Sequence, residues 1–93
     1  MRIKVEFAGG LDMLFNAKQL EVDIPDDTNI RKLIELLRDE HIKRDRELFA
    51  TGSKIRPGVL ILVNDVDFEV LESYDYKLKQ NDTVLFVSTL HGG

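Results

Sequence analysis

The last two residues of the sequence, Gly92 and Gly93, are the ones whose type and position suggest chemistry. Glycine has no Cβ atom, so two consecutive glycines can pass through a channel that is too narrow for other residues. A carboxylate carried on such a segment could reach the α-phosphate of ATP, and adenylation would turn this poor electrophile into one with a good leaving group. The pair therefore predicts a C-terminal carboxyl group that another protein activates.

Three residues precede the glycines, giving the segment Thr89, Leu90, His91, Gly92 and Gly93. It follows directly on a run of strand-forming residues from 83 to 88, and we therefore expect it to be a projecting tail. A final Gly-Gly pair in a generic protein is more often an extension without function. Its position immediately after a strand favours the functional interpretation.

The rest of the sequence offers no pattern typical of an active site. There is no cysteine, which excludes disulfides, thiolate metal sites and a cysteine nucleophile. His41 and His91 are far apart in the sequence, so no metal site is expected. Gly9-Gly10 is interpreted as a turn, because no Lys-Ser or Lys-Thr pair completes a phosphate-binding loop. We expect the chain to bind no cofactor itself and to rely on a partner for catalysis.

Length and composition predict one small globular domain. The 93 residues, 43% hydrophobic and 32% charged, suffice for a single core. A formal net charge of -4 repels nucleic acid, so direct binding of RNA or DNA is not expected. No segment approaches the roughly 18 apolar residues of a membrane span, and the N-terminus lacks a signal-peptide core. We therefore expect a cytoplasmic protein that does not bind membranes, with the nucleus as a second location.

Hydrophobic periodicity predicts one helix among several strands. Residues with helical spacing follow the segment 26–28, whose oxygens could cap the start of a helix. Alternation of polar and apolar residues predicts an N-terminal hairpin, and further strands follow the helix. The expected strands are 2–7, 19–24, 59–63, 67–71 and 83–88, the helical positions are Ile30, Leu33, Ile34 and Leu37, and loops at 45–58 and 74–78 contact the core through Leu48, Phe49, Tyr74 and Leu78.

This order of elements is that of an α+β protein with the β-grasp fold, in which one main helix packs on one face of a mixed sheet of four to five strands. The first and last strands can pair in parallel at the centre of such a sheet. The chain would then leave the sheet from the end of the last strand. We expect a single domain of residues 1–93, with 89–93 as the projecting tail.

The strands at 59–63 and 83–88 are apolar on both faces, although one helix can cover only one face. Either the loops at 45–57 or 73–80 fold over the second face, or that face is a docking patch for a partner. Strand alternation pairs Leu60 with Leu62 and Leu85 with Val87, and we expect these four side chains to face outward beside the tail.

Several segments are also recognisable together: V-E-F-A-G-G-L-D-M-L-F at 5–15, E-L-F at 47–49, R-P-G-V-L-I-L-V-N-D-V-D-F-E-V-L at 56–71, and D-Y-K-L-K-Q-N-D-T-V-L-F-V-S-T-L-H-G-G at 75–93. Through them the chain closely resembles the ubiquitin-related modifiers, sulfur carriers of tRNA thiolation, over essentially its whole length. The ending S-T-L-H-G-G is highly specific here, whereas Gly-Gly alone also fits ubiquitin and the bacterial molybdopterin and thiamin carriers. Phe68, where many relatives carry Trp, is a departure that does not touch the tail.

The resemblance implies that an E1-like enzyme with a rhodanese domain adenylates Gly93 with ATP and, with a persulfide sulfur donor, converts it to a thiocarboxylate. A tRNA thiolase would then place the sulfur on the wobble uridine of certain tRNAs, and Gly93 could also be joined to lysines of target proteins. Gly92 would provide clearance, while Leu90 and His91 would be gripped by the enzyme. Two alternatives remain open: a non-covalent ubiquitin-like binding module, and the small subunit of a molybdopterin synthase.

Overall fold

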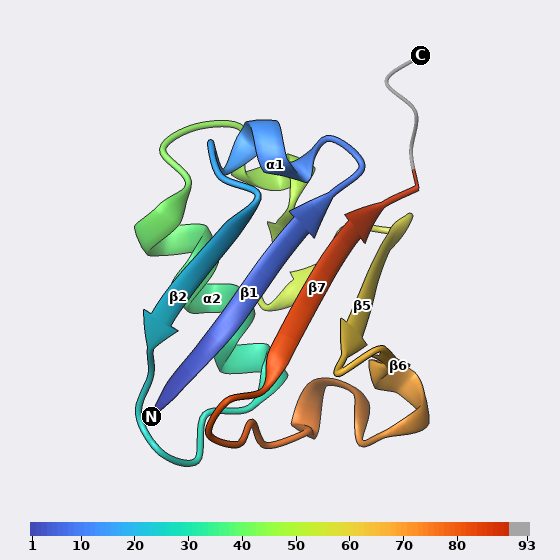
Figure 1. Cartoon of the computed structure of the whole chain (residues 1–93). Coiled ribbons are helices and arrows are strands. Elements are labelled where there is room, and N and C mark those ends of the chain that lie inside the picture. Colours follow the sequence, from blue (N-terminus) through green and yellow to red (C-terminus); the bar gives the residue numbers. More distant parts are fainter. Residues whose placement is uncertain (90–93) are drawn as a thin grey trace.

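The computed structural model describes residues 1–89 and contains a five-stranded mixed sheet with one long helix behind it (Figure 1). The strand order is β2-β1-β7-β5-β6, and the edge strand β6 is Val66–Asp67. The two central strands, β1 (Arg2–Ala8) and β7 (Thr83–Ser88), run parallel, while β2 (Gln19–Asp23) and β5 (Val59–Val63) flank them in antiparallel pairings. The predicted α+β arrangement and the parallel pairing of the first and last strands are confirmed.

The long helix, α2 (Ile30–His41), covers one face of the sheet with an apolar stripe. Its four predicted core positions are fully buried, as helical spacing requires: Ile30, Leu33, Ile34 and Leu37. The cap predicted at 26–28 is wrong, because the Thr28 hydroxyl donates to the Pro25 carbonyl oxygen in the preceding turn. Asn29 is the N-cap instead, and its side-chain oxygen accepts a hydrogen bond of 2.8 Å from the backbone N–H of Lys32.

The connections differ from the predictions in two places. The hairpin between β1 and β2 contains a short helix, α1 (Leu11–Leu14), which buries Leu11. The predicted strand 67–71 is wrong beyond its first residue: the edge strand β6 is Val66–Asp67, and Phe68–Val70 forms a 3₁₀ turn, η2. This 3₁₀ turn forms because the Asp67 carboxylate accepts a hydrogen bond of 2.9 Å from the backbone N–H of Glu69. The turn directs the Phe68 side chain into the core.

The segment predicted as a loop at 45–58 contains a 3₁₀ turn, η1 (Arg46–Leu48), and a small hairpin of β3 (Ala50–Thr51) and β4 (Lys54–Ile55). Phe49 is fully buried, as predicted, whereas Leu48 is 42% exposed, contrary to the prediction. Two adjacent residues at the end of such a turn point in different directions, so only one can enter the core. A further 3₁₀ turn, η3 (Ser73–Asp75), precedes the buried Leu78.

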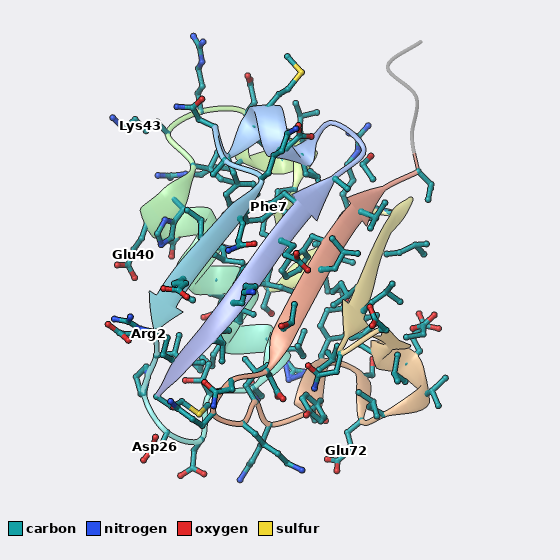
Figure 2. The ribbon with its side chains drawn as sticks, in the orientation of Figure 1. Arg2, Phe7, Asp26, Glu40, Lys43 and Glu72 are labelled. Carbon is teal, nitrogen blue, oxygen red and sulfur yellow. The ribbon has the colours of Figure 1, made fainter. Side chains whose placement is uncertain are left out.

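Aromatic residues fill the core behind the second half of β7. The ring centroids of Phe7 and Phe15 are 3.9 Å apart in a stacked pair, and those of Phe49 and Phe86 are 5.2 Å apart, edge to face. Such pairs contribute about 0.5–1.5 kcal/mol each beyond their buried area. Phe7 lies in the half of the sheet towards which β7 runs (Figure 2). The cluster therefore supports the end of β7 from the helix side.

The beginning of β7 is held by the buried carboxylate of Asp82. It accepts hydrogen bonds from the Asn64 side-chain amide at 2.9 Å, the Tyr76 hydroxyl at 3.0 Å and the backbone N–H of Lys79 at 2.9 Å. These donors compensate the cost of burying the carboxylate. The strand that leads to the C-terminal residues is thus fixed at its start as well as along its buried face.

Candidate functional site

Thr89, the residue after β7, is hydrogen-bonded to the turn before β5. The Thr89 backbone N–H and hydroxyl both donate to the Gly58 carbonyl oxygen, at 2.8 and 2.6 Å. Thr89 is exposed, but these two hydrogen bonds attach it to the domain, so its predicted place in a projecting tail needs a correction. The other predicted tail residues, Leu90, His91, Gly92 and Gly93, lie outside the described residues.

Gly9 packs directly against the backbone of Ser88 on the other side of β7. A Cβ atom added to Gly9 would lie 2.1 Å from the Ser88 carbonyl oxygen, and the residue has a φ of +72°. Both constraints admit only glycine. Gly9 contacts Ser88, and Thr89 contacts Gly58. We call these four residues the tail base. The interpretation of Gly9 as a plain turn residue missed this contact, which follows only once β1 is paired in parallel with β7.

Gly9→Ala is expected to destabilise the domain by about 2–4 kcal/mol, because it adds an overpacked contact to the cost of a positive φ. Gly52→Ala is the matched control, since Gly52 has a φ of +62° with no atom within 4 Å of an added Cβ. Gly52→Ala should lower the free energy of unfolding by only about 1–2 kcal/mol, which is the cost of a positive φ without a steric contact. Urea unfolding of both variants measures the difference, and equal losses would show that the contact with Ser88 is not restrictive.

Beside the tail base, β5 and β7 present four apolar side chains on the open face of the sheet. Leu60 lies opposite Val87, and Leu62 opposite Leu85. Leu60 is 49% exposed, and the other three are half-buried. Alternate residues of the same strands, Val59, Ile61, Val63, Val84 and Phe86, are buried under α2 and its neighbours. We call Leu60, Leu62, Leu85 and Val87 the outer patch.

The loops that were the alternative cover for this face pack on the helix side. Phe49, from the first loop, contacts Phe86 in the core. In the second loop, Leu78 is buried and its backbone N–H donates to the Thr28 carbonyl oxygen before α2, at 2.9 Å. Figure 1 shows the open face of the sheet in front and α2 behind it. Within residues 1–89, therefore, neither loop covers the outer patch.

Charged residues border the outer patch on the side of β1 and β2. Glu6 lies opposite Leu85, and Lys4 lies opposite Thr83. Farther along, Arg2 Nε donates to Asp23 Oδ1 at 3.0 Å, and this hydrogen bond lowers the pKa of Asp23. An apolar centre with a polar border is the usual composition of a protein interface. The face is suited to binding another protein.

The pKa shifts of the described residues have structural causes. The hydrogen bond from Arg38 lowers the pKa of Asp39, and burial, followed by the hydrogen bond with Asp82, raises the pKa of Tyr76. Arg38 and Asp39 belong to α2, and Tyr76 lies near the start of β7, so none of them belongs to the tail base. Among residues 1–89, no three His, Asp or Glu side chains are grouped as a metal site requires, and no helix is long and apolar enough to cross a membrane.

Comparisons with known proteins find a family and relatives that match essentially the whole chain. The family model described as Urm1 (Ubiquitin related modifier) matches residues 2–93. The chain is 41% identical to the ubiquitin-related modifier 1 homolog of Dictyostelium discoideum, with all of both chains covered. The solution structure of Urm1 from Trypanosoma brucei is 43% identical, with 99% of this chain and 95% of that one covered and a TM-score of 0.84. A putative molybdopterin converting factor subunit 1 from Pyrococcus furiosus is 25% identical, with 97% and 99% covered and a TM-score of 0.75.

Proposed function

The chain belongs to the ubiquitin-related modifier family, and from this premise we propose that it is a sulfur carrier whose Gly93 carboxyl group is adenylated by a separate E1-like enzyme and converted to a thiocarboxylate. One observation carries the proposal: the family match extends to Gly93, on a domain whose last strand is anchored up to Thr89. In this proposal the enzyme binds the domain, and all catalytic groups belong to the enzyme.

The proposed chemistry needs only a carboxylate from this chain. Attack of the Gly93 carboxylate on the α-phosphate of ATP releases pyrophosphate and forms an acyl adenylate. A persulfide sulfur of the enzyme then attacks the carbonyl carbon and AMP leaves. Cleavage of the sulfur–sulfur bond by a thiol leaves one sulfur on Gly93 as the thiocarboxylate. The two terminal glycines provide the clearance for both attacks.

The tail base limits where the enzyme can perform this chemistry. Four residues beyond Thr89 extend at most about 14 Å, since a fully extended residue spans about 3.3–3.6 Å. An enzyme that binds Gly93 must therefore also contact the domain close to Thr89. The outer patch lies beside this point, because Val87 and its partner Leu60 are next to the last residue pair of the strands, Val59 and Ser88. We propose that the enzyme docks on the outer patch.

The later steps are proposed from the family resemblance. The thiocarboxylate would pass its sulfur to a tRNA thiolase for 2-thiolation of the wobble uridine, and Gly93 would alternatively be joined to lysines of target proteins. The net charge of -4 supports a carrier that does not bind tRNA itself. Both roles use the activated Gly93 carboxyl group, so we expect sulfur transfer and conjugation to compete for one cytoplasmic pool of activated chain.

ATP–pyrophosphate exchange tests the first step of this proposal. With the E1-like enzyme of the same organism, we expect exchange to depend on added chain and to saturate with its concentration. The enzyme alone, and the enzyme with a chain that lacks Gly92 and Gly93, are the controls. Exchange that does not respond to the full-length chain would contradict the proposal.

A second candidate is the small subunit of a molybdopterin synthase, favoured by the similarity to the Pyrococcus furiosus protein. It shares the activation chemistry and differs in the protein that receives the sulfur. Transfer of sulfur from the thiocarboxylate form to a tRNA thiolase supports the carrier of tRNA thiolation. Transfer to a large molybdopterin synthase subunit supports the second candidate.

A further inference from the structure

A groove of about 660 Å³ lies between α1 and the segment that follows α2. One wall comes from α1, with Met13 and Leu14, and the other from the chain up to Leu48 in η1. Figure 1 shows α1 at the end of the sheet where β7 finishes. The groove therefore lies at the end of the domain where β7 finishes.

Large apolar side chains on both walls of the groove face solvent. Met13 is 82% exposed and Leu48 is 42% exposed. Their positions follow from the local structure: α1 uses Leu11 to contact the core, and η1 places the adjacent Phe49 there instead of Leu48. Exposed apolar side chains that line one groove can be covered together by an apolar residue of a partner.

The groove is also positively charged at its border, although the chain as a whole is acidic. Lys43 and Arg44 line it, and among the described residues neither side chain makes an ion pair or hydrogen bond. Neighbouring arginines are engaged, since Arg38 binds Asp39 and Arg46 Nε donates to the Ile42 carbonyl oxygen. Figure 2 shows Lys43 at the periphery of the molecule. These cations, with a single carboxylate in the lining, Asp45, complement an acidic ligand.

The groove and the tail base contain adjacent residues of the chain. Gly10 lines the groove, and the preceding residue, Gly9, packs on the backbone of Ser88. A protein that binds Gly93 must cover this end of the domain, because the four residues after Thr89 extend at most about 14 Å. Resting on the proposed function, we propose that the groove binds a segment of the activating enzyme in which a large apolar side chain is flanked by carboxylates. The enzyme then contacts the domain on two sides of the tail base, the groove and the outer patch.

Charge reversal at the groove tests this inference. The Lys43→Glu/Arg44→Glu variant is expected to raise the Kd for the activating enzyme about tenfold at low ionic strength, and this effect should shrink as salt screens the charges. The matched control is Lys77→Glu/Lys79→Glu, which changes the net charge equally on exposed residues that precede β7, at the other end of the strand. The control should bind as the unmodified chain does, and titration calorimetry measures all three.

The apolar part of the inference has its own variant. Met13→Ser/Leu48→Ser is expected to raise the Kd several-fold with little dependence on salt, because it removes apolar contact rather than charge. Groove variants that bind like the unmodified chain, or a control that is weakened as much as they are, would overturn the inference. Pyrophosphate exchange with the unmodified chain is measured first. Its absence would contradict the proposed function itself, so the two failures are distinguishable.

Discussion

Deletion of Gly93 is expected to reduce adenylation at least a hundredfold and to leave the stability of the domain unchanged. The shortened chain still ends in a carboxylate, on Gly92, but this group lies one residue short of the position that Gly93 reaches, a deficit of about 3.3–3.6 Å. Misplacement of a reacting group by only about 1 Å can cost a hundredfold in rate. Single-turnover formation of the adenylate with saturating enzyme measures the effect.

Urea unfolding of the same variant provides the control for stability. The deleted residue lies beyond Thr89, the last residue that hydrogen-bonds to the domain in the described part of the chain, so the unfolding midpoint should match that of the full-length chain. A truncated chain that is adenylated at the normal rate, or that still supports tRNA thiolation, would refute the role of Gly93.

Leu62→Asp is expected to weaken binding of the activating enzyme about thirtyfold or more, the loss typical of a residue at the centre of an interface. Leu62 lies opposite Leu85 in the outer patch, and a carboxylate there would have to be desolvated when the enzyme covers it. Val70→Asp is the matched control, because Val70 is 76% exposed and belongs to η2, outside the outer patch. It should leave the Kd within about twofold, as surface substitutions away from an interface do.

The same pair of experiments separates a carrier from a non-covalent binding module. A binding module with an inert tail would lose its function through Leu62→Asp and keep it after deletion of Gly93. A carrier loses its function through either change, by loss of affinity in one case and of the reacting group in the other. Normal enzyme binding by Leu62→Asp would refute the outer patch as the docking surface and leave the role of Gly93 intact.

Patterns with a regular period allowed most of the fold to be predicted. Alternation groups Leu60 with Leu62 in β5 and Leu85 with Val87 in β7, and this grouping needs no knowledge of the tertiary structure because it depends on a period of two. Both faces of these strands are apolar, so alternation alone does not decide which group faces α2. The structure shows that these four side chains lie on the face opposite α2. Whether the opposite face is open depends on the paths of the loops, and the sequence left that question undecided.

Two of the mistaken predictions fall where neighbouring residues compete for one role. Several oxygens near Pro25 could cap α2, and only the tertiary structure shows that Thr28 is used by the turn and Asn29 by the helix. Leu48 and Phe49 are both apolar, so hydrophobicity cannot decide which one is buried. The tail base and the groove were missed for another reason: both join segments more than 25 residues apart in the sequence, which no local pattern connects.

The most direct test of the central proposal is the intact mass of the chain after incubation with the activating enzyme, ATP and a sulfur donor, compared with a chain that lacks Gly93. The proposal predicts that the full-length chain alone gains the mass difference between sulfur and oxygen, in a group that hydrolysis can remove. An unchanged mass, with the enzyme shown to be active on another carrier, would contradict the proposal.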